Sequence, residues 1–178
     1  MPEDIVFRIA TPQDADDITH LVNTTYHGPE SIRGWTPEAH LHAGPRTHLN
    51  SVMRDIENPN ARIVLAYSRG SLVGCATIEH HGDDAHFGMF AVRPSLQGGG
   101  IGRAILAETE RLAADLWQCK TMTMSSINLQ ENLIAYYERR GFVPTGERQP
   151  FPFAENAGAL RTDYDLIILR KDLKPSRP

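Results

Sequence analysis

Three strand-like segments follow one another between residues 62 and 93, and this order constrains the fold of the 178-residue chain more than any other feature. Arg62–Tyr67, Leu72–His80 and Ala85–Arg93 are separated only by two short turns, Ser68-Arg-Gly-Ser71 and His81-Gly-Asp-Asp84. Turns this short join antiparallel neighbours. Three strands connected in this way exclude a simple doubly wound parallel sheet.

The segments on either side of these strands alternate between strand and helix. In chain order we expect a strand at Ile5–Ile9, a helix opened by Thr11-Pro12, a helix over Thr47–Glu57, and, after the three strands, a helix over Gly100–Trp117, a strand at Lys120–Ser125, a helix over Gln130–Arg140, a strand beginning at Phe142–Val143 and a last strand at Tyr164–Leu169. A helical crossover between strands excludes an all-β barrel. The expected fold is therefore α+β, with a mixed, mostly antiparallel central sheet of six to seven strands flanked by helices. We expect one domain over residues 1–171 and a frayed tail over 172–178.

Composition narrows the classes of function. The chain has 18 basic and 22 acidic residues, which gives a net charge of −4 with histidine neutral. That balance, without a run of Lys or Arg, disfavours nonspecific binding to nucleic acid or to an anionic membrane. No apolar stretch approaches the roughly 18 residues of a membrane span, and the acidic start Met1-Pro-Glu-Asp4 is unlike a signal peptide. Cys75 and Cys119 are expected to be buried thiols in a cytoplasmic protein.

The segment Gln97-Gly-Gly-Gly-Ile-Gly102 lies between the end of a strand and the start of the strongest helix. Glycine lets the backbone approach a ligand closely, and a helix start adds unpaired N–H groups and partial positive charge. Together they predict a phosphate or pyrophosphate site. The segment is not the phosphate loop of NTPases, which needs a lysine after its last glycine, nor a dinucleotide fingerprint, which needs glycine where Arg103 stands.

Two motifs resemble one known family. Gln97–Gly102 resembles the Gln/Arg-x-x-Gly-x-Gly/Ala signature of the GNAT N-acetyltransferase superfamily. Leu133–Phe142, in which Tyr137 precedes Gly-Phe, resembles the second signature of that family, and the match covers roughly residues 62–145. The resemblance implies an enzyme that transfers an acetyl group from acetyl-CoA to a primary amine of a small molecule or peptide, by direct attack in a ternary complex.

The resemblance also implies which residues hold acetyl-CoA. The main chain of Phe90, Ala91 and Val92 would pair with the pantetheine arm as an added strand does. The loop that would hold the pyrophosphate comprises Gln97, Gly98, Gly99, Gly100, Ile101 and Gly102, with Arg103 as a nearby cation. Family members often have asparagine seven residues before the motif tyrosine to contact the pantetheine. Gln130 stands there in this chain, and Asn128 or Asn132 are alternatives.

The catalytic residues implied are an acid and a base. Tyr137 would donate a proton to the departing thiolate, while Tyr136, some 100° further round the helix, is expected to pack. The base stays open among residues of the flanking strands, namely Glu79, His80, His81 and His86. His86 ranks first, because it lies six residues before Val92, at a position where many family members carry a glutamate. Glu79 ranks close to it. No metal site is expected.

The acceptor side is expected in the segment Tyr26–His48, which holds Tyr26, Glu30, Arg33, Trp35 and Arg46. Tyr26, Glu30 and Trp35 are the substrate-binding candidates, and the mixed charges do not choose the acceptor. Three rival readings stay open: a non-catalytic acyl-CoA-binding or sensing module, a transferase for a longer acyl-CoA, and a nucleotide-binding module that would prefer ATP or NAD to CoA. Neither a nucleic acid nor a membrane is expected as partner, and the resemblance allows a homodimer.

Overall fold

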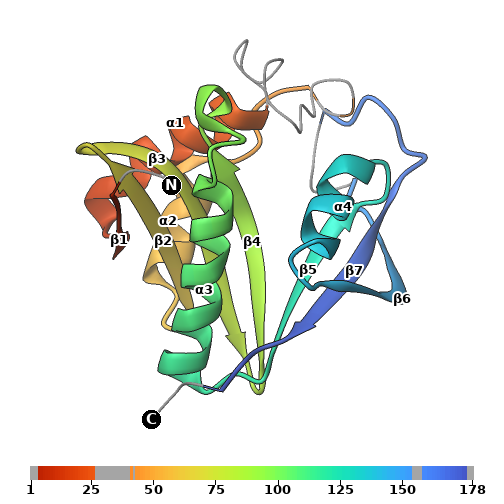
Figure 1. Cartoon of the computed structure of the whole chain (residues 1–178). Coiled ribbons are helices and arrows are strands. Elements are labelled where there is room, and N and C mark those ends of the chain that lie inside the picture. Colours follow the sequence, from red (N-terminus) through yellow and green to blue (C-terminus); the bar gives the residue numbers. More distant parts are fainter. Residues whose placement is uncertain (1–3, 27–40, 42, 154–157, 176–178) are drawn as a thin grey trace.

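The computed structural model describes residues 4–26, 41, 43–153 and 158–175 (Figure 1). The elements, in chain order, are β1 (Ile5–Ile9), the short 3-10 helix η1 (Pro12–Asp14), α1 (Ala15–Tyr26), α2 (Leu49–Glu57), β2 (Ala61–Ser68), β3 (Ser71–His81), β4 (Asp84–Val92), the 3-10 helix η3 (Pro94–Leu96), α3 (Ile101–Trp117), β5 (Thr121–Ile127), α4 (Glu131–Glu138), β6 (Val143–Pro150) and β7 (Asp165–Asp172). The strands form one seven-stranded sheet in the order β1-β2-β3-β4-β5-β7-β6.

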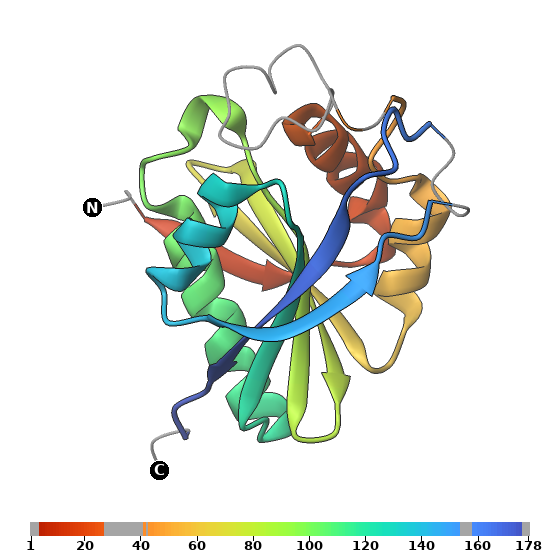
Figure 2. The ribbon, with the colours of Figure 1, turned by 90° about the vertical axis from the view of Figure 1, so that its right-hand side faces the viewer.

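The sheet confirms the expected mixed, mostly antiparallel architecture. Among its paired neighbours only β4 and β5 run parallel; the others are antiparallel. Helices α3 and α4 cover one face of the sheet, and α1 and α2 cover the other (Figure 2). The last strand is longer than expected, because β7 pairs with the whole of β5, from Leu166 opposite Ile127 to Asp172 opposite Thr121.

The first helix starts at a carboxylate that its neighbours hold in place. Asp14 accepts the Thr11 main-chain N–H at 2.7 Å and both terminal nitrogens of Arg8, at 2.8 and 2.6 Å. The hydrogen bonds from Arg8 lower the pKa of Asp14 to about 2. A threonine cap followed by proline thus opens the helix as expected, although its first turn is the 3-10 helix η1.

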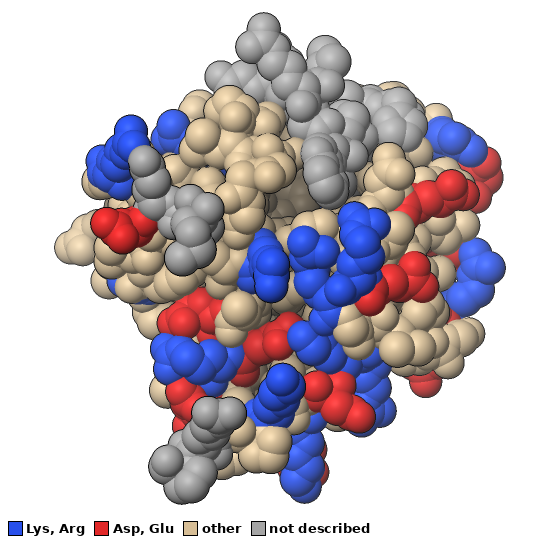
Figure 3. All heavy atoms as spheres, viewed as in Figure 1, with Lys and Arg blue, Asp and Glu red and all other residues tan. Residues whose placement is uncertain are grey.

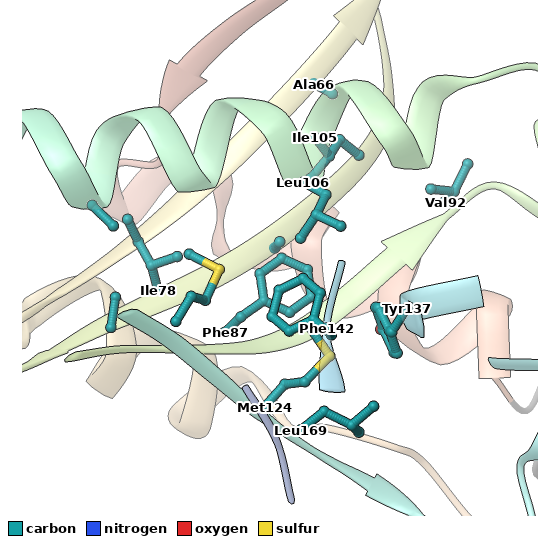
Figure 4. Close-up of a cluster of buried hydrophobic side chains, with 14 of the residues drawn as sticks. Ala66, Ile78, Phe87, Val92, Ile105, Leu106, Met124, Tyr137, Phe142 and Leu169 are labelled. Atoms are coloured by element: carbon teal, nitrogen blue, oxygen red, sulfur yellow. The ribbon is translucent and has the colours of Figure 1, made fainter. Parts of the chain in front are cut away.

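Each face of the sheet has its own apolar core. On the face of α3, Ile105 and Leu106 point toward Phe87 of β4 and Phe142, the residue before β6 (Figure 4). On the other face, Ile18 of α1 and residues of α2 pack on β2 and β3. This alternation follows from strand geometry, in which successive side chains point to opposite faces.

Strands β4 and β5 stay together for only three residue pairs, and this is the feature that makes a site. The last of those pairs joins His86 to Thr123, and beyond it the strands diverge (Figure 1). Asp84 holds the closed end, because its carboxylate accepts the hydroxyls of Thr121 at 2.7 Å and Thr123 at 2.6 Å. The diverging edge of β4 therefore has main-chain groups without a neighbouring strand.

A β-bulge shapes that same edge. Thr77 of β3 pairs with Gly88, but Cys75 pairs with Ala91, so β4 carries one residue more than its partner. Met89, within the bulge, has φ of 45°, a conformation uncommon for a residue with a side chain. Bulges re-aim the strand locally, and here the bulge lies where β4 leaves β5.

Candidate functional site

A cavity of about 300 Å³, here called the donor cavity, lies between the start of α3, α4 and the end of β4. It is lined by Thr25, Tyr26, Phe90, Val92, Gln97, Gly98, Gly100, Gly102, Arg103, Leu133, Tyr136 and Arg140. The end of β4, the glycine loop Gln97–Gly102 and Arg103 therefore contribute to the wall of one cavity.

The glycines of the loop are used for their conformation and for their lack of a side chain. Gly98 and Gly100 have φ of 85° and 88°, in the region that favours glycine. A Cβ on Gly102 would lie 2.9 Å from both Phe90 Cζ and Tyr136 Oη. The main-chain ladder of α3 begins with Ala104 N–H donating to Gly100 at 3.0 Å, so the N–H groups at this end of the helix have no intrahelical partner.

Positive charge surrounds this cavity. Lys and Arg side chains gather between α3 and α4 on this face (Figure 3), and Arg103 and Arg140 line the cavity itself. The guanidinium carbon of Arg140 lies 3.8 Å from the centre of the Tyr136 ring. Its Nε is buried and has no hydrogen-bond partner among the described residues. Free N–H groups, a helix start and arginines together suit an anion.

Tyr136 differs from the expectation that it only packs. It lines the donor cavity and stacks on Phe90, with ring centroids 6.4 Å apart. Burial raises the pKa of Tyr136, while Arg140 acts in the opposite direction. The helical spacing was right, since Tyr136 and Tyr137 do face different ways; each face borders a different cavity.

Six residues predicted to hold the donor do not line this cavity: Asn128, Gln130 and Tyr137 lie beyond it, and so do Ala91, Gly99 and Ile101 of the strand and loop. Ala91 and Ile101 are buried in the two apolar cores, and Gly99 stands outside the lining set. In a strand and at a helix start, alternate residues point away from any one surface. The side chains of Ala91 and Ile101 are therefore structural, and only the main chain of these two residues is available to a ligand.

Side chains already bond to the open edge of β4. The Tyr26 hydroxyl donates to the carbonyl of Phe90, and Gln97 Nε2 donates to the carbonyl of Val92 at 3.0 Å. The main-chain N–H of Arg93, the residue after Val92, donates to the carbonyl of Val73 in β3. Carbonyls of Phe90 and Val92 thus point away from β3, toward the space between β4 and β5.

A second cavity, of about 370 Å³, lies in that space and is here called the acceptor cavity. Its wall includes Tyr137 and Leu133 of α4, Val22 of α1, Asp55 of α2, Ser125 and Ser126 of β5, and Phe151 and Tyr164 near the β6–β7 connection. Tyr26, Phe90 and Leu133 line both cavities. These three side chains form the shared wall between them.

Tyr137 borders the acceptor cavity and is only 5% exposed. Its ring packs against Phe87, Phe90 and Phe142, with centroids 6.1–6.3 Å apart. Burial raises the pKa of the Tyr137 hydroxyl well above its usual value of 10. The phenol therefore keeps its proton at neutral pH, which a general acid requires.

The structure places two of the candidate amide side chains, Gln130 and Asn128, in different surroundings. Gln130 lines the acceptor cavity, and its buried Nε2 has no hydrogen-bond partner among the described residues. Asn128 instead accepts the main-chain N–H of Asp165 at 3.1 Å. That bond ties the end of β5 to β7, whereas Gln130 lies in the wall of the acceptor cavity and not in that of the donor cavity.

The two base candidates ranked first, His86 and Glu79, lie side by side but outside both cavities. Glu79 and His86 are register partners on β3 and β4, on the face of α2, and Thr123 Oγ1 lies 3.5 Å from His86 Nδ1. Burial, and then His81, lowers the pKa of His86, although Asp84 and Glu79 act in the opposite direction. His86 is therefore neutral near pH 7 and able to accept a proton.

Sequence reasoning missed most of the acceptor cavity, including Asp55 and Gly88. Burial raises the pKa of Asp55, and the negative charge of Glu79 adds to the effect. Neither residue belongs to a motif, and only the cavity that both of them line reveals them. Of the acceptor candidates, Tyr26 and Arg46 line this cavity. Glu30, Arg33 and Trp35 lie outside the described residues.

Solved structures with the same fold span the whole chain. An Escherichia coli ribosomal-protein-S18-alanine N-acetyltransferase superposes with a TM-score of 0.71 at 18% identity, covering 98% of this chain and 97% of that one. A spermidine N-acetyltransferase chimera that includes the Vibrio cholerae enzyme gives 0.69 at 15% identity, covering 94% and 95%. A GNAT-family acetyltransferase from Staphylococcus aureus Mu50 gives 0.68 at 12% identity, covering 96% and 100%. A search of curated protein sequences gave no match.

The diverging parallel strands, the glycine loop at a helix start and the tyrosine helix define the class of protein, an acyltransferase. Residues 59–144 match the family described as acetyltransferase (GNAT) domain. The chain therefore carries a GNAT acetyltransferase domain. In the part of the chain that the structure describes, no helix has the length and apolar character needed to cross a membrane.

Proposed function

We propose that this protein is an acetyl-CoA-dependent N-acetyltransferase that acetylates a primary amine by direct attack in a ternary complex. The observation that carries the proposal is the pair of cavities, which meet at Tyr26, Phe90 and Leu133. One cavity has the chemistry of a site for a phosphorylated donor. The other contains a buried acid and a carboxylate. A donor and an amine bound in the two cavities would meet at the shared wall.

The residues of the donor cavity fit acetyl-CoA. The N–H groups at the start of α3, with Arg103 and Arg140, suit the diphosphate, and the absent side chain of Gly102 leaves room between Phe90 and Tyr136. The open edge of β4 suits the amides of a pantetheine arm. When bound, acetyl-CoA supplies an acetyl group already activated as a thioester.

The residues of the chain would handle two protons. Tyr137 holds a phenolic proton in a buried position and would give it to the departing sulfur. The incoming ammonium must lose a proton before its nitrogen can attack. His86 or Glu79 would accept that proton through water, because neither borders the acceptor cavity directly. A main-chain N–H at the bulge of β4 would polarise the thioester carbonyl.

Titration calorimetry with acetyl-CoA, CoA, ATP and NAD tests the donor assignment. We expect acetyl-CoA and CoA to bind, and ATP and NAD to bind far more weakly. The variant Arg103→Gln should weaken acetyl-CoA binding about tenfold, since it removes a charge-assisted contact. Arg111→Gln is the matched control, because Arg111 lies on α3 but pairs with Glu108 and Asp115 away from the cavity. A folded protein that does not bind acetyl-CoA would refute the proposal.

Turnover separates the enzyme from its rivals. A non-catalytic acyl-CoA-binding module would bind acetyl-CoA yet release no CoA with any amine. A transferase for a longer acyl group would turn over butyryl-CoA or a longer donor faster than acetyl-CoA. A donor series assayed by thiol release, with a fixed amine mixture, distinguishes all three.

A further inference from the structure

The acceptor cavity has polar and apolar regions that restrict which amine can bind, provided that the proposed function is right. We infer that the acceptor is a small arylalkylamine, a single primary amine on a short chain that ends in an aromatic or similarly flat apolar group. The inference rests on a carboxylate without a partner, a buried hydroxyl without a partner, and an aromatic wall at one side of the same cavity.

Asp55 is the site for the ammonium group. It lies half-buried on α2, and among the described residues it has neither a hydrogen bond nor an ion pair. Burial and the nearby Glu79 raise its pKa, and the opposing effect of Arg54 is the smallest of the three, so the charged form of Asp55 is disfavoured in this environment. A bound ammonium would supply the missing opposite charge and a charge-assisted hydrogen bond.

Ser126 is a second, independent sign of a ligand. Ser126 is 5% exposed and lines the cavity, and among the described residues its Oγ has no hydrogen-bond partner. Buried hydroxyls are normally paired, because leaving one unpaired costs free energy. Gln130 Nε2, on the same wall, is also buried and unpaired. The wall of the cavity thus contains buried polar atoms for which the described residues offer no partner.

The aromatic wall would receive the body of the amine. Phe151 and Tyr164 line the cavity with their ring centroids 5.0 Å apart, and Phe153 packs against both. Ile127 and Leu166 line the cavity beside them. Aromatic rings favour edge-to-face and offset contacts with another ring. A flat apolar group would bind here better than a polar chain.

Gly88 provides the room for this body near the bulge. A Cβ on Gly88 would meet no atom within 4 Å, and the residue lines the acceptor cavity but not the donor cavity. By strand alternation its missing side chain would point to the face of α2, toward which His86 also points. A larger residue at this position would therefore fill acceptor space and leave the donor cavity unchanged.

The charges of the described wall argue against a polyamine. Asp55 and Arg46 are the charged residues among those that line the cavity in the described segments. A second ammonium of a polyamine would find no second carboxylate among the described lining residues, because Glu79, although near Asp55, does not line the cavity. A single amine with an apolar body matches this distribution better.

A panel of acceptors tests the inference directly. With acetyl-CoA as donor, phenethylamine and tryptamine are compared with spermidine, glycine, an aminoglycoside and a peptide with amino-terminal alanine. We expect kcat/KM for the arylalkylamines to exceed that for every other acceptor by about tenfold or more, equal to about 1.4 kcal/mol in the transition state. A higher value for spermidine, the peptide or the aminoglycoside overturns the inference, as does no turnover of either arylalkylamine.

Two variants keep the test independent of turnover. Calorimetry measures phenethylamine binding to the protein with CoA present and again with CoA absent. Asp55→Asn and Gly88→Leu should each weaken phenethylamine binding about tenfold, while acetyl-CoA binding changes by less than about twofold. Asp115→Asn, on the outer face of α3, is the control.

The outcomes separate the two proposals. If acetyl-CoA does not bind to folded protein, the proposed function fails, whereas phenethylamine binding that Gly88→Leu abolishes would still support the site. If acetyl-CoA binds but phenethylamine does not, or binds equally well to both variants, the inference about the acceptor fails and the proposed function stands.

Discussion

The hydroxyl of Tyr26, the last residue of α1, donates a hydrogen bond to the main-chain carbonyl of Phe90 at the open edge of β4. That carbonyl belongs to the edge with which the pantetheine arm would pair in the proposed complex. The tyrosine also forms part of the wall between the two cavities. The donor and Tyr26 therefore compete for one acceptor atom.

The first prediction follows from this competition. Tyr26→Phe keeps the ring and removes the competing hydrogen bond, which is worth about 1 kcal/mol. We expect acetyl-CoA to bind about three to five times more tightly to the variant, measured by calorimetry. Tyr67→Phe is a suitable control, because that hydroxyl accepts a hydrogen bond from Arg8 and Tyr67 lines neither cavity. Unchanged or weaker binding to Tyr26→Phe would show that the donor does not use the Phe90 carbonyl.

The second prediction concerns the proposed acid. Tyr137→Phe should lower kcat about 100-fold, the usual scale for general acid catalysis, while acetyl-CoA binding changes by less than about twofold. Because the pKa of Tyr137 lies well above 10, the wild-type rate should not fall below pH 10 through loss of this proton. An unchanged kcat would exclude Tyr137 as the acid. A large loss of acetyl-CoA binding would assign the residue to donor binding instead.

The third prediction concerns the proposed base. The pKa of His86 lies below its ordinary value of 6.5, chiefly because of burial. If His86 accepts the proton of the amine, kcat/KM should rise with pH through an apparent pKa below 6.5 and then level off. His86→Gln should remove this rise and lower the plateau about 100-fold. The exposed His20 of α1 provides the control His20→Gln. A pH profile that survives in His86→Gln would turn attention to Glu79 or Asp55.

The fourth prediction concerns stability and does not depend on function. Asp14 has a pKa of about 2 against an ordinary 3.8, so the folded state favours its charged form. Its contribution is fully present above the unfolded pKa and is lost as pH falls from about 4 to about 2. Asp14→Asn should therefore reduce the free energy of unfolding by about 1–2 kcal/mol at pH 7.

Urea unfolding at pH 7 and pH 2.5 checks this. The wild type and Asp14→Asn should differ clearly at pH 7 and much less at pH 2.5. The control Asp115→Asn breaks a surface ion pair on α3, and its effect at pH 7 should stay below about 0.5 kcal/mol. An equal effect of both variants would show that the Arg8–Asp14 contact adds little.

Local signals explain what could be predicted from the sequence. The strand order rests on alternation and short turns, and the glycine loop and Tyr137 belong to motifs within single elements. The structure contains these features because each of them depends only on residues that are close together in the sequence. The choice between Gln130 and Asn128 was harder, because both carry an amide at the end of β5. The structure distinguishes them, because Asn128 accepts a hydrogen bond from the main chain of Asp165 while Gln130 lines a cavity.

The rest of the site depends on distances that no pattern in the chain encodes. Asp55 becomes relevant because it lines the same cavity as residues of β4 and β5, and Gly88 because its neighbours leave space beside it. Phe151 and Tyr164 meet across the connection between two strands. Tyr136 was expected to pack because its helical face was known, while the cavity on that face was not. Tertiary approach, rather than local preference, decides each of these positions.

The three-pair contact between β4 and β5 also has a consequence for the evolution of such a protein. The donor cavity is built mostly from the end of β4, α3 and α4, whereas the aromatic wall of the acceptor cavity comes from Phe151 and Tyr164, later in the chain than the divergence. Substitutions or changes of loop length in that second half need not disturb the glycine loop. Selection could thus exchange one amine for another while the donor stays the same.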